Sequence, residues 1–69
     1  MRISARNQLD GVVTHVSDGA VMSTVVVRLS GGQEVVAAIT KDSVEHLDLK
    51  EGDAVKAVIK ATEVMIAKD

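Results

Sequence analysis

Cysteine and aromatic residues are absent from this 69-residue chain. Without cysteine, disulfides and thiolate metal sites are excluded, and His15 and His46 have no partner at metal-ligand spacing, which argues against structural zinc. Without Phe, Trp or Tyr, the chain lacks the stacking platforms of barrel proteins that bind single-stranded nucleic acid. The net charge is −2, and the acidic and basic residues are mixed along the chain. No basic stripe is therefore available for a phosphate backbone, and we expect no nucleic-acid partner.

Long apolar runs are also missing. No run approaches the roughly 20 residues that a membrane span requires, and the segment Met1–Asn7 lacks the apolar stretch of a secretory signal. We therefore expect a cytoplasmic protein with no membrane partner. Its length allows one domain at most, residues 1–69, and chains below about 70–80 residues rarely gain more than ~3–5 kcal/mol from one apolar core. With disulfides and metals excluded, oligomerisation is the support that remains.

Valine-rich segments with period-2 alternation dominate the chain, and the hydrophobic fraction is 46%. β-Branched side chains of this kind suit pleated, closely packed strands. Glycine-containing turns separate the segments, and Gly11 is expected to mark a bend or bulge within the first. Alternation and the spacing of the turns predict five strands, at Asn7–Val16, Ala20–Leu29, Glu34–Thr40, Ala54–Ile59 and Thr62–Ala67.

The alternation stops between the third and fourth expected strands. There Thr40 or Asp42 is expected to cap one or two helical turns, with Val44 and Leu47 facing inward. Five short strands with one helical turn after the third predict an all-β fold, a small closed or nearly closed barrel of the OB type. Strands such as Val35–Ile39 are apolar on both faces, so a subunit interface is expected to cover the face that does not fill the barrel.

Catalytic groups do not stand out. His15 lies in an expected strand without an obvious acidic partner and His46 lies in a solvated turn, so both are interpreted as surface histidines. The carboxylates fall mostly at turns and strand ends, as solvated charges do. Gly31 and Gly32 lack the other residues of a phosphate-binding loop. We expect no enzymatic activity.

Hydrogen-bond donors do gather at the ends of the expected strands. A tetrahedral oxyanion offers only acceptors, so its site must consist of donors and must keep carboxylates away. Strand alternation places Ser4 and Arg6 on one side of an extended segment, and it places Lys60 and Thr62 together in the same way. Taken alone, such pairs are more typical of solvated surface than of a site. The full set of donors is Ser4, Arg6, Asn7, Thr40, Ser43, Lys60 and Thr62.

Motifs along nearly the whole chain form a specific set. The opening is Ile3-Ser4-Ala5-Arg6-Asn7-Gln8-Leu9 followed by Gly11, and the close is Val58-Ile59-Lys60-Ala61-Thr62-Glu63-Val64-Met65-Ile66. Between them lie Gly19-Ala20-Val21, Gly31-Gly32, Ile39-Thr40, Asp42-Ser43-Val44 and Glu51-Gly52. In this set the chain resembles the molbindins, the Mop family of small molybdate- and tungstate-binding proteins.

The resemblance implies an OB-like barrel that assembles as a homohexamer, a trimer of dimers, for intracellular storage and homeostasis of molybdate or tungstate. The metal is held as its oxyanion at subunit interfaces, without direct metal ligands from the protein. One subunit would contribute Ser4, Ala5, Arg6 and Asn7, and a neighbour would contribute Thr40, Ser43, Lys60, the backbone N–H of Ala61, and Thr62. The family also has a second class of site near the threefold axis, for which Gly19–Ser23 and Asn7 are candidates.

Three other functions stay open. A regulatory or accessory module that acts on a partner protein would leave an exposed apolar patch on the assembled oligomer. An OB-type nucleic-acid binder would retard nucleic acid in a gel at low salt. A purely structural module with an empty polar interface would melt at the same temperature with and without molybdate.

Overall fold

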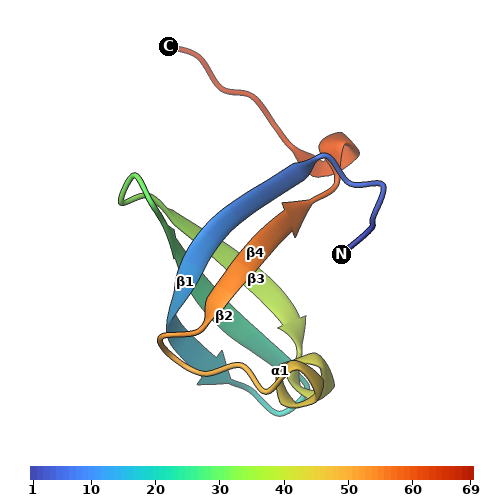
Figure 1. Cartoon of the computed structure of the whole chain (residues 1–69), viewed down its shortest axis with the longest axis vertical. Helices are drawn as coiled ribbons and strands as arrows, with labels where there is room; N and C mark the ends of the chain where they lie inside the picture. Colours follow the sequence, from blue (N-terminus) through green and yellow to red (C-terminus); the bar gives the residue numbers. More distant parts are fainter.

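The structure, a computed structural model, describes residues 1–69 and forms a strongly curled antiparallel sheet with a short helix at one end (Figure 1). The strand order is β3-β2-β1-β4, and no helix is long and apolar enough to cross a membrane. The all-β, OB-like class with one helix after the third strand is confirmed, but the sheet has four strands and not five. The elements are β1 (Asn7–Asp18), β2 (Met22–Leu29), β3 (Glu34–Thr40), α1 (Lys41–Leu47), β4 (Ala54–Ile59) and the 3₁₀ helix η1 (Ala61–Glu63).

The core lies inside the curl and is small. Val13 of β1, Val25 and Val27 of β2, and Val44 of α1 form one buried apolar cluster. Ser23, on the same face of β2, is also buried, and its hydroxyl donates a hydrogen bond to Asp18 Oδ1 at 2.7 Å. Only five of the 69 residues are buried. A single chain therefore leaves twelve large apolar side chains exposed.

Helix α1 closes one end of the curl. Thr40 accepts a hydrogen bond from the Ser43 backbone N–H and caps the helix, as the sequence predicted. Val44 faces the core and is buried, whereas Leu47 also faces inward, on the apolar cavity inside the curl, but stays 61% exposed. The helix spans seven residues and ends at Asp48, whose left-handed conformation (φ 51°) redirects the chain so that Leu49 packs against the core cluster.

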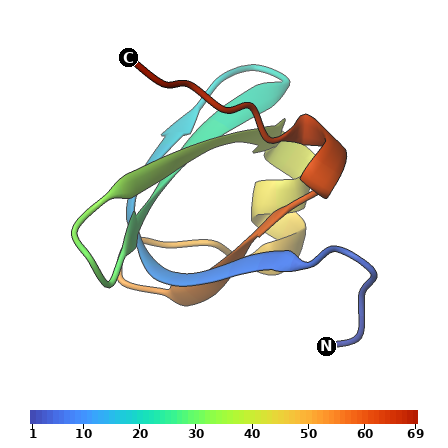
Figure 2. The ribbon, with the colours of Figure 1, turned by 90° about the horizontal axis from the view of Figure 1, so that it is seen from above.

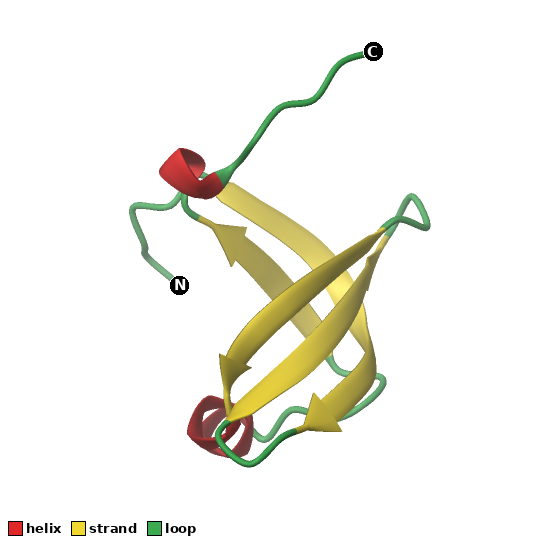
Figure 3. Cartoon of the chain, turned by 180° about the vertical axis from the view of Figure 1, so that it is seen from behind, coloured by secondary structure: helices red, strands yellow, loops and turns green.

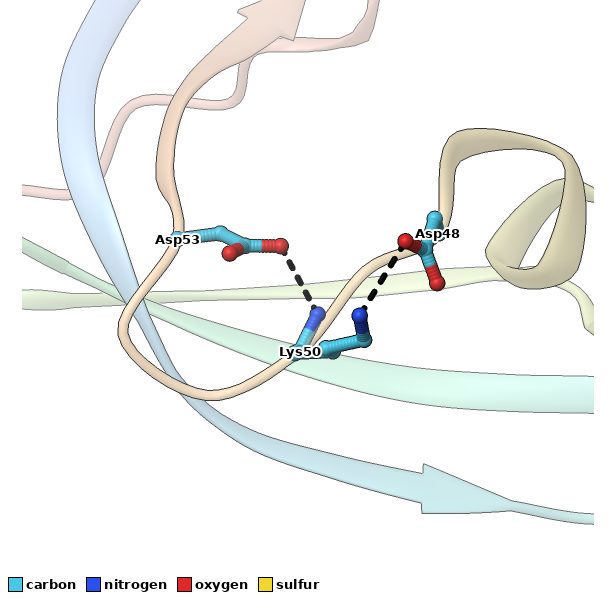
Figure 4. Close-up of polar contacts among 3 residues, drawn as sticks. All are labelled: Asp48, Lys50 and Asp53. Carbon is cyan, nitrogen blue, oxygen red and sulfur yellow. Dashed lines mark hydrogen bonds and ion pairs between the residues drawn. The ribbon is translucent and has the colours of Figure 1, made fainter.

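The loop after α1 is held by its own polar groups (Figure 4). The backbone N–H of Lys50 donates to Asp53 Oδ2 at 2.9 Å, and Lys50 Nζ lies 3.1 Å from Asp48 Oδ2. Gly52, with a φ of 93°, supplies the turn before β4 begins. Because the polar groups of the loop bond to one another, the segment Ala54–Ile59 is free to pair along β1.

The expected fifth strand is absent from the chain. After η1, residues Val64–Asp69 have no regular secondary structure; they extend away from the sheet in Figure 1 and cross one end of the curled sheet when seen from above (Figure 2). Met65 and Ile66 are 90% and 89% exposed. A strand persists only where a neighbouring strand takes its N–H and C=O groups, and η1 directs this segment away from both sheet edges. Within one chain, this apolar, strand-like segment therefore pairs with no other strand.

The sheet curls without closing, because β3 pairs only with β2 and β4 pairs only with β1. A cavity of about 420 Å³ lies inside, lined almost entirely by apolar side chains from these two edge strands and from the core. Val35 and Ile39 of β3 line it opposite Val55 and Ile59 of β4. The predicted barrel is thus open between β3 and β4.

Gly11 pairs regularly on both sides, with Leu29 of β2 and Val55 of β4. The bulge expected at Gly11 lies instead at Thr14, where the β1–β2 register shifts between Val13 and His15. A Cβ on Gly11 would lie 2.5 Å from Val27 Cγ1 and 2.7 Å from the Arg28 carbonyl oxygen. Glycine is present there because β2 approaches the backbone too closely for any side chain.

We expect Gly11→Ala to lower the free energy of unfolding by about 1–3 kcal/mol, because the added methyl group overpacks the β1–β2 contact. Urea unfolding followed by far-UV circular dichroism, at one fixed protein concentration, measures the change. Gly31→Ala is the matched control, since its Cβ would meet only the end of the flexible Gln33 side chain. Equal stability of the two variants would contradict the close-approach explanation.

Candidate functional site

An open cavity of about 500 Å³ lies between the segment that precedes β1 and the segment that follows β4. Figure 3 shows the N-terminal segment and η1 together at one end of the sheet, with α1 at the other. One wall comes from the residues before β1 and the other from the end of β4 and η1. The lining residues are Ile3, Ser4, Ala5, Arg6, Val58, Lys60, Ala61 and Thr62.

The β1–β4 pairing builds this cavity. Asn7, the first residue of β1, pairs with Ile59, the last of β4, and the strands are antiparallel. The residues just before Asn7 therefore lie beside the residues just after Ile59. Glu63 N–H donates to the Lys60 carbonyl at 2.9 Å and forms the tight turn of η1. This turn holds Lys60 and Thr62 next to the N-terminal segment.

The cavity is electropositive. Arg6 and Lys60 both line it and neither forms a salt bridge, while no carboxylate lines it. Ser4 and Thr62 add hydroxyl groups that can donate. The Ala61 backbone N–H makes no backbone hydrogen bond. The cavity thus combines two unpaired cations with uncommitted neutral donors, which is the composition that an anion requires.

Thr40 and Ser43 lie elsewhere, at the start of α1 and at the opposite end of the sheet (Figure 1). The Thr40 hydroxyl donates to Ser43 Oγ at 2.7 Å and accepts from the Ser43 N–H at 3.0 Å. The single hydroxyl proton of Thr40 is therefore used in the hydrogen bond to Ser43. The Ser43 hydroxyl keeps its own proton, which is free for an acceptor outside the chain.

The structure thus brings together six of the nine predicted site residues and separates three. Asn7 begins β1 and does not line the cavity, and Thr40 and Ser43 are remote from it. The resemblance assigned Lys60 and Ala61 to a different subunit from Ser4 and Arg6, but all four line one cavity of one chain.

Sequence reasoning missed the apolar part of the wall, Ile3 and Val58. The sequence could indicate only one of these two residues. Ile3 belongs to the opening motif, next to the donor Ser4. Val58 joins the wall through its pairing with Gln8, and the register between two distant strands cannot be predicted from local sequence.

Other candidate groups are engaged or isolated. His15 does have an acidic neighbour, contrary to expectation, because its Nδ1 lies 3.7 Å from Glu51 Oε1 on the exposed surface. No group of three or more His, Cys, Asp or Glu side chains is placed to hold a metal ion. In the Gly19–Ser23 stretch, Gly19 N–H bonds to the Met22 carbonyl and the buried Ser23 hydroxyl bonds to Asp18.

Comparisons with known proteins agree with each other. A family model described as the TOBE domain matches residues 3–66. Molybdenum-pterin-binding protein 3 of Clostridium pasteurianum is 52% identical over 66 residues, which cover 96% of this chain and 97% of that protein. A molybdate-binding protein from Sporomusa ovata has a solved structure with a TM-score of 0.93 and 48% identity, covering 99% of this chain and 100% of that one. The structure of the cytoplasmic molybdate-binding protein ModG, with molybdate bound, has a TM-score of 0.84 and 46% sequence identity, and the match covers 88% of this chain and 43% of that one.

We expect Thr40→Ala to destabilise the fold by about 1 kcal/mol, the usual effect of losing a helix N-cap side chain. Thr40→Ser keeps the hydroxyl and should restore most of that loss. Urea unfolding of the two variants and the parent protein measures the difference. A Thr40→Ser variant as unstable as Thr40→Ala would show that the methyl group, and not the cap, is what matters.

Proposed function

The chain belongs to the TOBE-domain family and is similar over nearly its full length to molybdenum-pterin-binding (Mop) proteins, and from that premise we propose that it binds and stores molybdate or tungstate. The chain forms a single Mop domain, residues 1–69, and the ion is held as the intact oxyanion with no chemical change. The observation that carries this proposal is the cavity between the N-terminal segment and η1, with its two unpaired cations and no carboxylate.

The donors match the chemistry of a tetrahedral dianion. Arg6 and Lys60 together offset a charge of −2, and hydrogen bonds to a charged acceptor are roughly twice as strong as neutral ones. Ser4, Thr62 and the Ala61 N–H add directional donors around the ion. Arg6, Lys60 and the Ala61 N–H cannot accept a hydrogen bond, so the hydrogen of a protonated phosphate could be accepted only by the Ser4 or Thr62 hydroxyl, which would then be lost as a donor to that oxygen. Molybdate and tungstate are alike in charge and size, so both fit.

A neighbouring subunit completes the site in this proposal. The cavity is open, and each chain also presents the Thr40–Ser43 pair at its other end, with one hydroxyl proton free. When two subunits pack with these ends together, Ser43 of one approaches the cations of the other. The family resemblance extends this arrangement to a homohexamer, a trimer of dimers. Storage in the cytoplasm agrees with the description of the relative ModG as cytoplasmic.

The same assembly would cover the open barrel. Val64, Met65 and Ile66 form an exposed segment that is apolar on both faces, and the edges of β3 and β4 flank an apolar cavity that nothing in the chain fills. Insertion of this segment from a second copy would supply the missing fifth strand, pair the free backbone groups of an edge, and bury both apolar surfaces. Exchange of an identical element between protomers closes a symmetric dimer.

Arg6→Ala and Lys60→Ala should each weaken molybdate binding by about 2 kcal/mol, or roughly 30-fold in Kd, because each removes a charged hydrogen-bond donor. Isothermal titration calorimetry with sodium molybdate measures the affinity. Arg28→Ala removes a positive charge outside the cavity and serves as the control for general electrostatic attraction. Equal losses in all three variants would show that net charge, and not this site, attracts the ion.

Deletion of residues 64–69 should reduce the number of subunits in the oligomer, because the barrel of each copy then stays open. Native mass spectrometry, with and without molybdate, reports subunit number and bound ions together. Lys68→Glu changes the charge of the tail and keeps its apolar segment, so it should leave the assembly intact. An unchanged oligomer after the deletion would rule out strand exchange, and a monomer that holds molybdate as tightly as the oligomer would rule out a shared site.

A further inference from the structure

The segment that carries Ser4 and Arg6 has almost no support of its own. Residues 1–6 belong to no helix or strand, and they take part in no backbone–backbone hydrogen bond. They form no salt bridge either. A single hydrogen bond involves them, from Gln8 Nε2 to the Ala5 carbonyl oxygen at 2.8 Å. This bond is the polar link between the segment and the folded sheet.

Gln8 is well placed to act as an anchor. It is the second residue of β1 and pairs with Val58 of β4, so its backbone is fixed in the β1–β4 ladder. Its side chain is half-buried and reaches back three residues along the chain. Gln8 does not line the cavity, although Val58 opposite it does. It therefore touches the segment that holds the donors and not the space where an ion would lie.

We propose that Gln8 is a positioning residue for the oxyanion site, one that pre-organises the Ser4–Arg6 segment through the Ala5 carbonyl. The inference rests on the proposed function. It is independent of the subunit arrangement, because both partners of the hydrogen bond belong to one chain.

Two effects follow from this hydrogen bond. The first is order: a segment held in its binding conformation before the ion arrives does not lose that freedom on binding, so affinity rises. The second is electrostatic. A carbonyl oxygen is an acceptor and repels an oxyanion, and the Gln8 amide satisfies the Ala5 carbonyl at the midpoint between two donor side chains. Both effects depend on a donor at position 8, which glutamine supplies and a carboxylate at neutral pH does not.

The test replaces Gln8 with a residue of similar length that cannot donate. Gln8→Met should weaken molybdate binding by about tenfold, and Gln8→Glu by at least as much, because its carboxylate adds repulsion. Gln33→Met and Gln33→Glu, made in the turn between β2 and β3, are matched controls and should bind like the parent protein. Calorimetry gives the affinities. Melting of the ligand-free proteins by circular dichroism should show no difference, because residues 1–6 lie outside the sheet.

A second readout needs no ligand and reports positioning directly. In ¹⁵N relaxation measurements on the ligand-free oligomer, the order parameters of residues 4–6 should fall from about 0.85 toward 0.6 or lower in Gln8→Met, while those of β1 stay constant. Unchanged order of residues 4–6, or unchanged affinity in Gln8→Met, overturns the inference. Failure of the parent protein to bind molybdate would instead refute the proposed function, so the two failures are distinguishable.

Discussion

The antiparallel pairing of β1 with β4 is the interaction on which the rest of the structure depends. The long strand β1 pairs through Asn7–Val12 with β4 and through Gly11–Asp18 with β2, so it must curl as it passes from one neighbour to the other. Gly11 makes this possible by allowing β2 to approach its backbone closely. The pairing also places the two ends of the folded region side by side, which creates the electropositive cavity. Because β4 uses one edge on β1 and never reaches β3, the same pairing leaves the barrel open.

Much of this fold follows from local sequence. The bounds of β3 and β4 were predicted to the residue, because polar turns and glycines flank two short, largely apolar segments, and Thr40 was one of two predicted caps. The fifth strand was predicted from the same signal and does not form. A strand-like apolar pattern predicts which side chains tend to be buried, but it does not predict whether the same chain or another copy buries them. In Val64–Ile66 the pattern describes a surface that the single chain leaves exposed.

The site divides in a similar way. Its residue types were predictable, since an oxyanion needs donors and the donor-rich motifs are short and free of acids. The grouping of these residues in one cavity of one chain was not predictable from local sequence, because the position of Lys60 beside Ser4 and Arg6 depends on the β1–β4 register and on the turn of η1. In the sequence, Gln8 appears only as one residue of the opening motif. Its importance depends on the absence of any other hydrogen bond to the first six residues, which is a property of the folded chain.

The nearness of the two ends of the fold also bears on how such a domain can be reused. Ile3–Arg6 and Lys60–Thr62 share one cavity, and the extended tail Val64–Asp69 could connect one copy to a second copy that follows it in the same polypeptide. Tethering would replace a bimolecular encounter with a high effective concentration. If the chain binds an oxyanion between subunits as proposed, gene duplication would then produce a covalent pair whose association no longer depends on protein concentration.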